Sequence, residues 1–122
     1  MSVYVTIGRN VGDEPMSDDQ WEAFRLSTYQ VVENLAGDVV TSAEGIGRYE
    51  GQTEATYVVV ADGSRIADTA DLGRVGDGWW EARTRDLYAA LGALGAQYGQ
   101  ESIAVTIAEP EFVVGKVFAD GS

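Results

Sequence analysis

Arg9 and Glu101 are the two side chains of this sequence whose types and positions could act at a single point. Arg9 follows the first predicted strand and Glu101 precedes the last one, and in a split β-α-β arrangement the ends of these units can approach each other. An arginine and a glutamate placed so could clamp a carboxylate, or neutralise each other as a structural ion pair or cap. We favour the structural pair.

Other catalytic side chains are scarce. The 122 residues include no histidine, no cysteine and a single lysine, Lys116. A Ser-His-Asp site, a Cys-His site and an ordinary zinc site are therefore excluded. This composition favours a protein that binds something over one that transforms it, so we expect no catalytic residues and no cofactor.

Carboxylates are plentiful, with twenty Asp and Glu in the chain. Four aspartates in the polar connection over 62–77 could offer oxygen ligands to Mg²⁺ or Ca²⁺. Their spacing is not that of an EF-hand, and we expect a solvated loop and no metal. Nothing selects a glycosidase pair among the twenty acids, and the glycine clusters lack the Gly-Lys-Ser/Thr end of a phosphate loop.

The net charge of −12 limits the partners. It repels phosphate backbones, so direct nucleic-acid binding is disfavoured. The acidic residues either keep a small domain soluble, which we favour, or mimic nucleic acid and occupy the basic groove of another protein. No secretion signal or membrane-spanning run is visible, so we expect a cytoplasmic protein without a membrane partner. Seven arginines against one lysine suggest a bacterial or phage gene.

Alternating and helical patterns predict one α+β domain over residues 1–122, with its core over about 3–108. In chain order we expect a strand over 3–7, a loop to Pro15, a helix from a capping box at Ser17–Gln20 to Gly37, a strand over 39–49 broken or bulged at Gly45 and Gly47, a strand over 53–61, a helix from Asp77 to Gly99, and a strand over 103–107. This is the ferredoxin-like β-α-β-β-α-β two-layer sandwich, with the first and third strands at the centre. An apolar segment over 109–122 adds a C-terminal strand.

The two faces of the predicted sheet differ in character. We expect the helices to cover Val3, Val5, Ile7, Val58, Val60, Ile103, Val105 and Ile107. The opposite face would then present Tyr4, Thr6, Tyr57, Val59, Ala104 and Thr106. Such a surface favours a homodimer or a cover made by the C-terminal segment, and a ligand cavity is the alternative. An RNA-stacking face is rejected because the basic residues that it needs are missing.

Trp79 is the remaining contact candidate. Trp80, Thr84, Leu87, Leu91, Leu94 and Tyr98 form one helical stripe, and Trp79 falls outside it. With Arg83 beside it, Trp79 could anchor another protein. It could equally pack under the connection over 62–77.

The exit of the second helix carries a pattern, Tyr98-Gly99-Gln100-Glu101-Ser102-Ile103. Together with Gly8-Arg9 and the helix start at Ser17, Trp21 and Phe24, it resembles a family of small uncharacterised bacterial domains, over about residues 3–107. The chain departs from that family at residues 34–37, where Asn-Leu-Ala-Gly replaces Phe-Pro-Asp-Gly. The resemblance implies the fold and transfers no activity.

Three functions remain open. We expect a small acidic protein-binding or regulatory accessory protein, most often as a homodimer, without catalytic activity. The alternative is a dimeric α/β-barrel enzyme or small-ligand binder, with Tyr4, Arg9, Tyr57 and Glu101 near a cavity. The third is an acidic nucleic-acid mimic that inhibits a basic partner.

Overall fold

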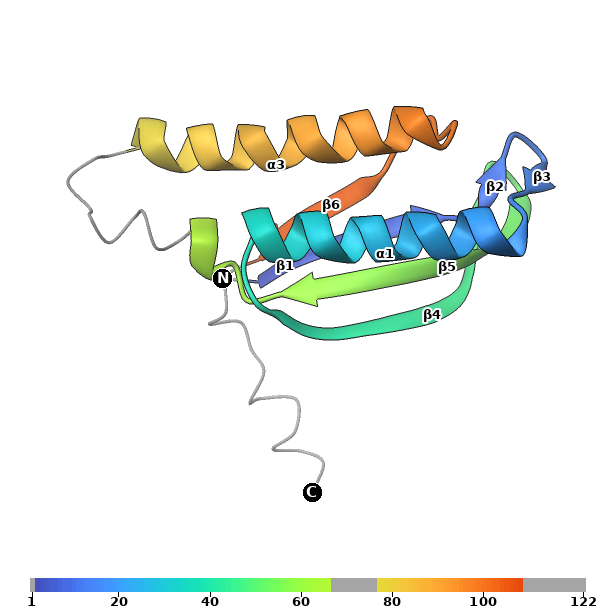
Figure 1. Cartoon of the computed structure of the whole chain (residues 1–122), viewed down its shortest axis with the longest axis horizontal. Helices are drawn as coiled ribbons and strands as arrows, with labels where there is room; N and C mark the ends of the chain where they lie inside the picture. The colour runs from blue at the N-terminus through green and yellow to red at the C-terminus, as the bar shows by residue number, and fades with distance from the viewer. Residues whose placement is uncertain (1, 67–76, 109–122) are drawn as a thin grey trace, which may run out of the picture.

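A four-stranded antiparallel sheet lies beneath two long helices in the computed structural model, which describes residues 2–66 and 77–108 (Figure 1). The strands are β1 (Ser2–Gly8), β4 (Val39–Tyr49), β5 (Gln52–Ala61) and β6 (Ala104–Ala108), in the order β4-β5-β1-β6. The helices are α1 (Asp18–Leu35) and α3 (Asp77–Gln97). The architecture is therefore α+β, and the first and third predicted strands lie at the centre as expected.

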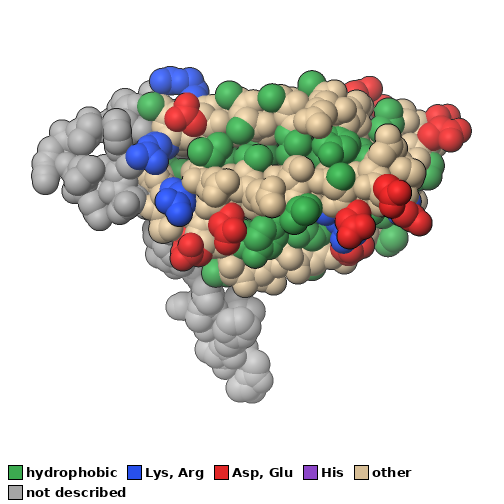
Figure 2. All heavy atoms as spheres, in the orientation of Figure 1, with side chains coloured by type: hydrophobic (Ala, Val, Ile, Leu, Met, Phe, Trp, Pro, Cys, Tyr) green, Lys and Arg blue, Asp and Glu red, His purple; other side chains and the backbone are tan. Residues whose placement is uncertain are grey.

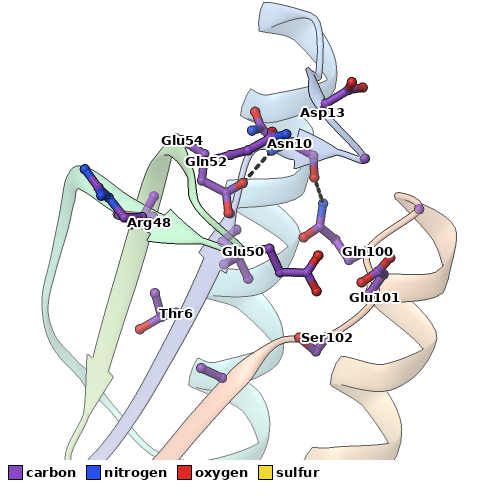
Figure 3. A pocket seen from close by; sticks show the side chains of 17 residues that line it. Thr6, Asn10, Asp13, Arg48, Glu50, Gln52, Glu54, Gln100, Glu101 and Ser102 are labelled. Atoms are coloured by element: carbon purple, nitrogen blue, oxygen red, sulfur yellow. Dashed lines mark hydrogen bonds between the residues drawn. The ribbon is translucent and has the colours of Figure 1, made fainter.

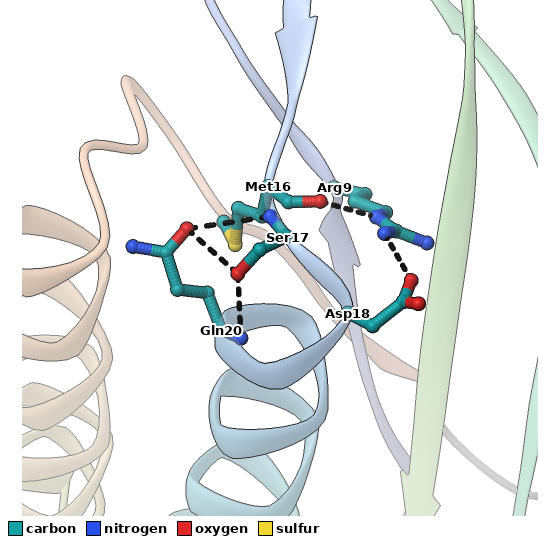
Figure 4. Close-up of polar contacts among 5 residues, drawn as sticks. All are labelled: Arg9, Met16, Ser17, Asp18 and Gln20. Atoms are coloured by element: carbon teal, nitrogen blue, oxygen red, sulfur yellow. Dashed lines mark hydrogen bonds and ion pairs between the residues drawn. The ribbon is translucent and has the colours of Figure 1, made fainter.

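The start of α1 is fixed by local hydrogen bonds. The Ser17 hydroxyl accepts from the amide of Gln20 at 3.2 Å, and the Gln20 side chain accepts from the amide of Ser17 at 3.3 Å (Figure 4). This reciprocal pair satisfies two amides that the first helical turn leaves without partners. The predicted capping box is confirmed, and the helix ends at a turn where Gly37 has a φ of +149°.

Both helices bury a stripe against the sheet. On α1 the buried residues are Trp21, Phe24, Thr28 and Val32, and on the described part of α3 they are Thr84, Leu87, Leu91 and Leu94. Tyr98 stacks on Phe24 with 4.7 Å between the ring centres, which joins the end of α3 to the start of α1. The predicted α3 stripe is confirmed at these positions. No helix in residues 2–66 or 77–108 is long and apolar enough to cross a membrane.

The prediction for the faces of β5 was wrong by one residue. Tyr57 and Val59 lie on the helix side, with Val59 fully buried, and Val58 and Val60 lie on the open side. The cause is the register with β1, in which Ile7 pairs with Tyr57 and Val5 with Val59. Residues that pair directly share a face, so the buried set of β1 selects Tyr57 and Val59.

Two smaller predictions also differ from the structure. The expected loop over 8–15 contains a short hairpin, β2 (Asn10–Val11) and β3 (Glu14–Pro15). The strand β4 runs unbroken through Gly45 and Gly47, and its irregularity lies between Val39 and Thr41. Gly47 instead permits a close cross-strand approach, because a Cβ there would lie 2.7 Å from Cγ2 of Thr56.

The predicted C-terminal strand over 109–122 lies outside the described residues. In the connection that follows β5, residues 64–66 are helical, and Ile66 is fully buried. The two glycines of α3 differ in their surroundings: a Cβ on Gly95 would meet Ile103 at 3.2 Å, whereas Gly92 faces open space.

Asp62 fastens the end of the sheet where α1 returns to β4. Its Oδ1 accepts from the amide of Ser64 at 2.9 Å and from the amide of Asp38 at 3.1 Å. Gly37 must lack a side chain here, because a Cβ would collide with the Asp62 carboxylate and with Ser64. The hydrogen bonds from Ser64, and then that from Asp38, hold the pKa of Asp62 below its ordinary value.

A depressed carboxyl pKa predicts how stability depends on pH. The contribution of Asp62 is present above the pKa of the unfolded chain and is lost as pH falls through the lower folded value. We therefore expect Asp62→Asn to unfold more easily than wild type at pH 7, with the difference shrinking as pH is lowered through about 4. Urea unfolding at several pH values measures this, and a difference that is constant with pH contradicts it.

Candidate functional site

A polar hollow of about 440 Å³ opens at the other end of the sheet (Figure 3). Three parts of the chain meet there: the end of β1 with the β2–β3 hairpin, the turn from β4 to β5, and the connection from α3 to β6. Its labelled lining residues in Figure 3 are Thr6, Asn10, Asp13, Arg48, Glu50, Gln52, Glu54, Gln100, Glu101 and Ser102. The hollow therefore depends on the tertiary fold and on no single motif.

The peptide groups of Asn10 tie these parts together. Its amide donates to Oε1 of Glu54 at 2.8 Å, and its carbonyl accepts from Nε2 of Gln100 at 2.9 Å. The two partners are 44 and 90 residues away along the chain, and both bonds are partly buried. Because partly buried polar groups must be paired, these bonds fix the β2–β3 hairpin against β5 and the α3–β6 connection.

Two glycines allow this close arrangement. A Cβ on Gly8 would collide with the carboxylate of Glu54, so the glutamate lies directly over the bare backbone of β1. Gly99 has a φ of +72°, a conformation that glycine adopts without strain, and turns the chain from α3 toward Gln100. A Cβ on Gly99 would also press on Val11 of the hairpin at 3.1 Å.

The turn from β4 to β5 carries strain. Its two central residues are Glu50, with a φ of +50°, and Gly51, with a φ of +81°, between the paired residues Tyr49 and Gln52. Two successive positive φ values are those of a type I′ hairpin turn, which prefers Asn or Asp before Gly. Glu50 therefore holds an unfavourable backbone conformation at the edge of the hollow.

Negative charge dominates the lining. The lining includes four carboxylates, those of Asp13, Glu50, Glu54 and Glu101, and one guanidinium, that of Arg48. Figure 3 shows the carboxylates of Glu50, Glu54 and Glu101 turned toward the middle of the hollow. Within the described part of the chain, no group of three or more acidic side chains is arranged to hold a metal ion. Separated carboxylates of this kind make the hollow electronegative.

Glu101 is the predicted contact residue that lines the hollow. Arg9 does not pair with it. The Arg9 guanidinium donates to the carbonyl of Met16 at 2.8 Å and to Asp18 at 2.6 Å, so it fastens the β2–β3 hairpin to the start of α1 (Figure 4). The expected Arg9–Glu101 pair was wrong because α1 supplies a nearer carboxylate at its first turn.

Tyr4 and Tyr57 were expected on one face and lie on opposite faces. Tyr4 is on the open face, as predicted, with 41% of its surface exposed. Tyr57 is buried on the helix side, with the Arg25 guanidinium 5.8 Å from its ring centre. Tyr57 therefore cannot contact a partner through the open face.

Arg83 and Trp79 lie near the start of α3, at the opposite end of that helix from the hollow. Arg83 donates to the carbonyl of Arg65 at 3.5 Å and so connects α3 to the chain after β5. The side chain of Trp79 lies outside the described residues, and its proposed role stays a prediction.

Sequence reasoning did not identify Asn10, Glu50, Glu54 or Gln100 as site residues. One signal was present. In a β-α-β-β-α-β chain the end of the first strand, the hairpin turn and the entry to the last strand meet at one end of the sheet. Glu50 and Glu54 lie in or just after the hairpin turn, and Glu101 lies at the entry to the last strand.

Comparison with known proteins gives one relevant likeness. No protein-family model matches the chain, and no curated protein matches it. A solved structure described as a phage SAM lyase in the apo state superposes with a TM-score of 0.53 at 22% sequence identity. The match covers 85% of this chain and 75% of that one. At this identity the likeness shows a shared fold.

The strain in the turn from β4 to β5 predicts how substitutions there change the stability of the protein. Replacing Glu50 by asparagine removes the left-handed strain, and we expect the free energy of unfolding to rise by about 1 kcal/mol. Gly51→Ala is the matched control. Open space surrounds Gly51, so a loss of about 1 kcal/mol there would come from backbone conformation alone. Urea unfolding measures both, and a destabilised Glu50→Asn protein would contradict the assignment of strain.

Proposed function

We propose that the hollow binds a small organic cation and that SAM (S-adenosylmethionine) is its ligand. The observation that carries this proposal is the carboxylate-rich lining, with four acids against one base. The sulfur of SAM bears a permanent positive charge and its amino group a second, so separated carboxylates attract it at two points. Arg48 at the edge of the same hollow offers a partner for its carboxylate. The solved structure of similar fold supplies the candidate ligand.

SAM cleavage suits a chain without histidine. When a carbon–sulfur bond of SAM breaks, its electron pair passes to the positive sulfur, which leaves as a neutral thioether and needs no proton. The carbon either accepts an electron pair from a nucleophile within SAM or forms a double bond after a base takes the neighbouring proton. The first route requires the site only to hold SAM with its own nucleophile close to the carbon that is attacked. In the second route a carboxylate of the site acts as the base. Lyase activity is therefore compatible with the side chains of this hollow.

The fold itself is part of the proposal. The strand order β4-β5-β1-β6, with antiparallel neighbours and two helices on one face, supports a ferredoxin-like split β-α-β sandwich. In that arrangement the ends of the central strands and the hairpin turn converge, and the hollow lies at that convergence.

Matched ligands test the role of charge. SAM and S-adenosylhomocysteine differ in the methyl group and the positive charge on sulfur. We expect SAM to bind at least about tenfold more tightly, because the neutral thioether loses a charge-assisted contact with the carboxylates. Titration calorimetry measures both affinities, and chromatography of the incubated SAM detects cleavage. Absence of SAM binding at millimolar concentration, or equal affinity for the two ligands, contradicts the proposal.

A second candidate function concerns the open face of the sheet. We propose that this face binds another copy of the chain, so that the protein acts as a homodimeric, protein-binding accessory protein. Tyr4 is 41% exposed there, beside the half-buried Val58 and Val60. Across β1 and β6 the neighbours of Tyr4 on this face are small and uncharged, such as Thr6, Ala104 and Thr106. Uncharged aromatic and aliphatic surface is typical of the centre of a protein interface.

A charge at Tyr4 tests this surface. We expect a wild-type homodimer by light scattering on a sizing column, and a monomer for Tyr4→Arg, because an arginine pair would be buried at the seam. Tyr88→Arg is the control, since Tyr88 is 49% exposed on α3, an element that packs on the other face. A wild-type monomer at every concentration, or equal effects of the two substitutions, would eliminate the homodimer.

A further inference from the structure

Glu54 differs from the other acids of the hollow in how it is held. Its Oε1 accepts the amide of Asn10 at 2.8 Å, in a partly buried bond. The rest of the carboxylate lies over Gly8, where any side chain would collide with Oε1 and Oε2. The group is therefore restrained by a hydrogen bond on one side and by the sheet backbone beneath it.

The register of the sheet makes this placement. Gly8 pairs with Thr56 on β5, and Thr56 pairs with Gly45 on β4, so a glycine on each side of Thr56 leaves the backbone of the open face bare. Glu54 lies two residues before Thr56 on the same face, at the end of β5 nearest the hollow. Its side chain can then cross over to Gly8 and reach the hairpin at Asn10.

A restrained carboxylate binds a cation at lower entropic cost than a mobile one. Glu50 is exposed on a turn and must be ordered by the ligand, whereas Glu54 is ordered already. Oε1 of Glu54 accepts from the amide of Asn10, and Figure 3 marks no hydrogen bond between the other carboxylate oxygen and the lining residues that it draws. That oxygen is available to a positive group in the hollow.

We propose that Glu54 is the carboxylate that receives the cationic sulfur of the ligand, and that Gly8 is the positioning residue that makes room for it. This inference rests on the proposed function. It assigns the charge preference of the site to one residue and its geometry to a second residue on another strand.

Two substitutions separate charge from position. Glu54→Gln keeps the size of the side chain and an oxygen for the Asn10 amide, but removes the charge. Gly8→Ala keeps the charge and displaces the carboxylate. Gly45→Ala is the matched control, because Gly45 flanks the same Thr56 and a Cβ there would lie at an ordinary 3.7 Å from its Oγ1.

The decisive readout is the ratio of affinities for SAM and S-adenosylhomocysteine, measured by calorimetry. We expect the ratio to fall at least about fivefold in Glu54→Gln and in Gly8→Ala, and to stay within twofold of wild type in Gly45→Ala. We expect the double variant to fall no further than either single variant, because both remove the same contact. A merely structural role would weaken both ligands alike and leave the ratio unchanged.

The outcomes separate the two proposals. If wild type binds SAM in preference to the thioether and Glu54→Gln keeps that preference, the assignment to Glu54 is overturned while the proposed function stands. If wild type binds neither ligand, the proposed function fails and the assignment falls with it. If Glu54→Gln does not fold, Gly8→Ala supplies the test, since its charge is unaltered.

Discussion

The antiparallel register between β1 and β5 is the constraint on which the rest of this structure depends. Pairing Val5 with Val59 buries one set of side chains beneath the helices and leaves the alternate set on the open face. The same register brings Gly8 opposite Thr56 and so places Glu54 above bare backbone. A slip of one residue would invert both faces and remove the carboxylate from the hollow, so core and site are fixed by one set of hydrogen bonds.

The two ends of the sheet differ in how their polar groups are arranged. At one end Asp62 satisfies the backbone amides of Asp38 and Ser64 and lies against Gly37, which gives a closed, locally bonded corner. At the other end Glu50 has a positive φ, and four carboxylates line the hollow. Figure 2 shows several basic side chains toward the end where α3 begins, and others beside acidic side chains toward the opposite end. Strain and like charge concentrated at one end are typical of a binding site.

The sequence predicted what local interactions determine. The capping box at Ser17 and the apolar stripe of α3 depend on residues within a few turns of each other, so spacing alone locates them. The face of β5 could not be predicted in this way, because Tyr57 to Val60 are all apolar and both phases of the alternation fit. The peptide groups of Asn10 bond to Glu54, which is 44 residues further along the chain, and to Gln100, which is 90 residues further. Only the completed sheet brings these residues together. Arg9 shows the same limit, since both Glu101 and Asp18 suit its charge and only the folded structure shows that Asp18 is the nearer one.

The net negative charge of the chain and the carboxylates of the hollow act on cations in different ways. A net charge of −12 attracts any cation over a Debye length of roughly 10 Å at moderate salt, but this general field does not discriminate among cations. Discrimination requires a carboxylate whose position is set before the ligand arrives, as the Asn10 amide and Gly8 set that of Glu54. Under the proposed function, cleavage of the sulfonium yields a neutral thioether, which lacks the charge that Glu54 is proposed to contact. The charge that recruits the substrate would then also favour release of the product, so a chain without histidine could use one fixed carboxylate for both steps.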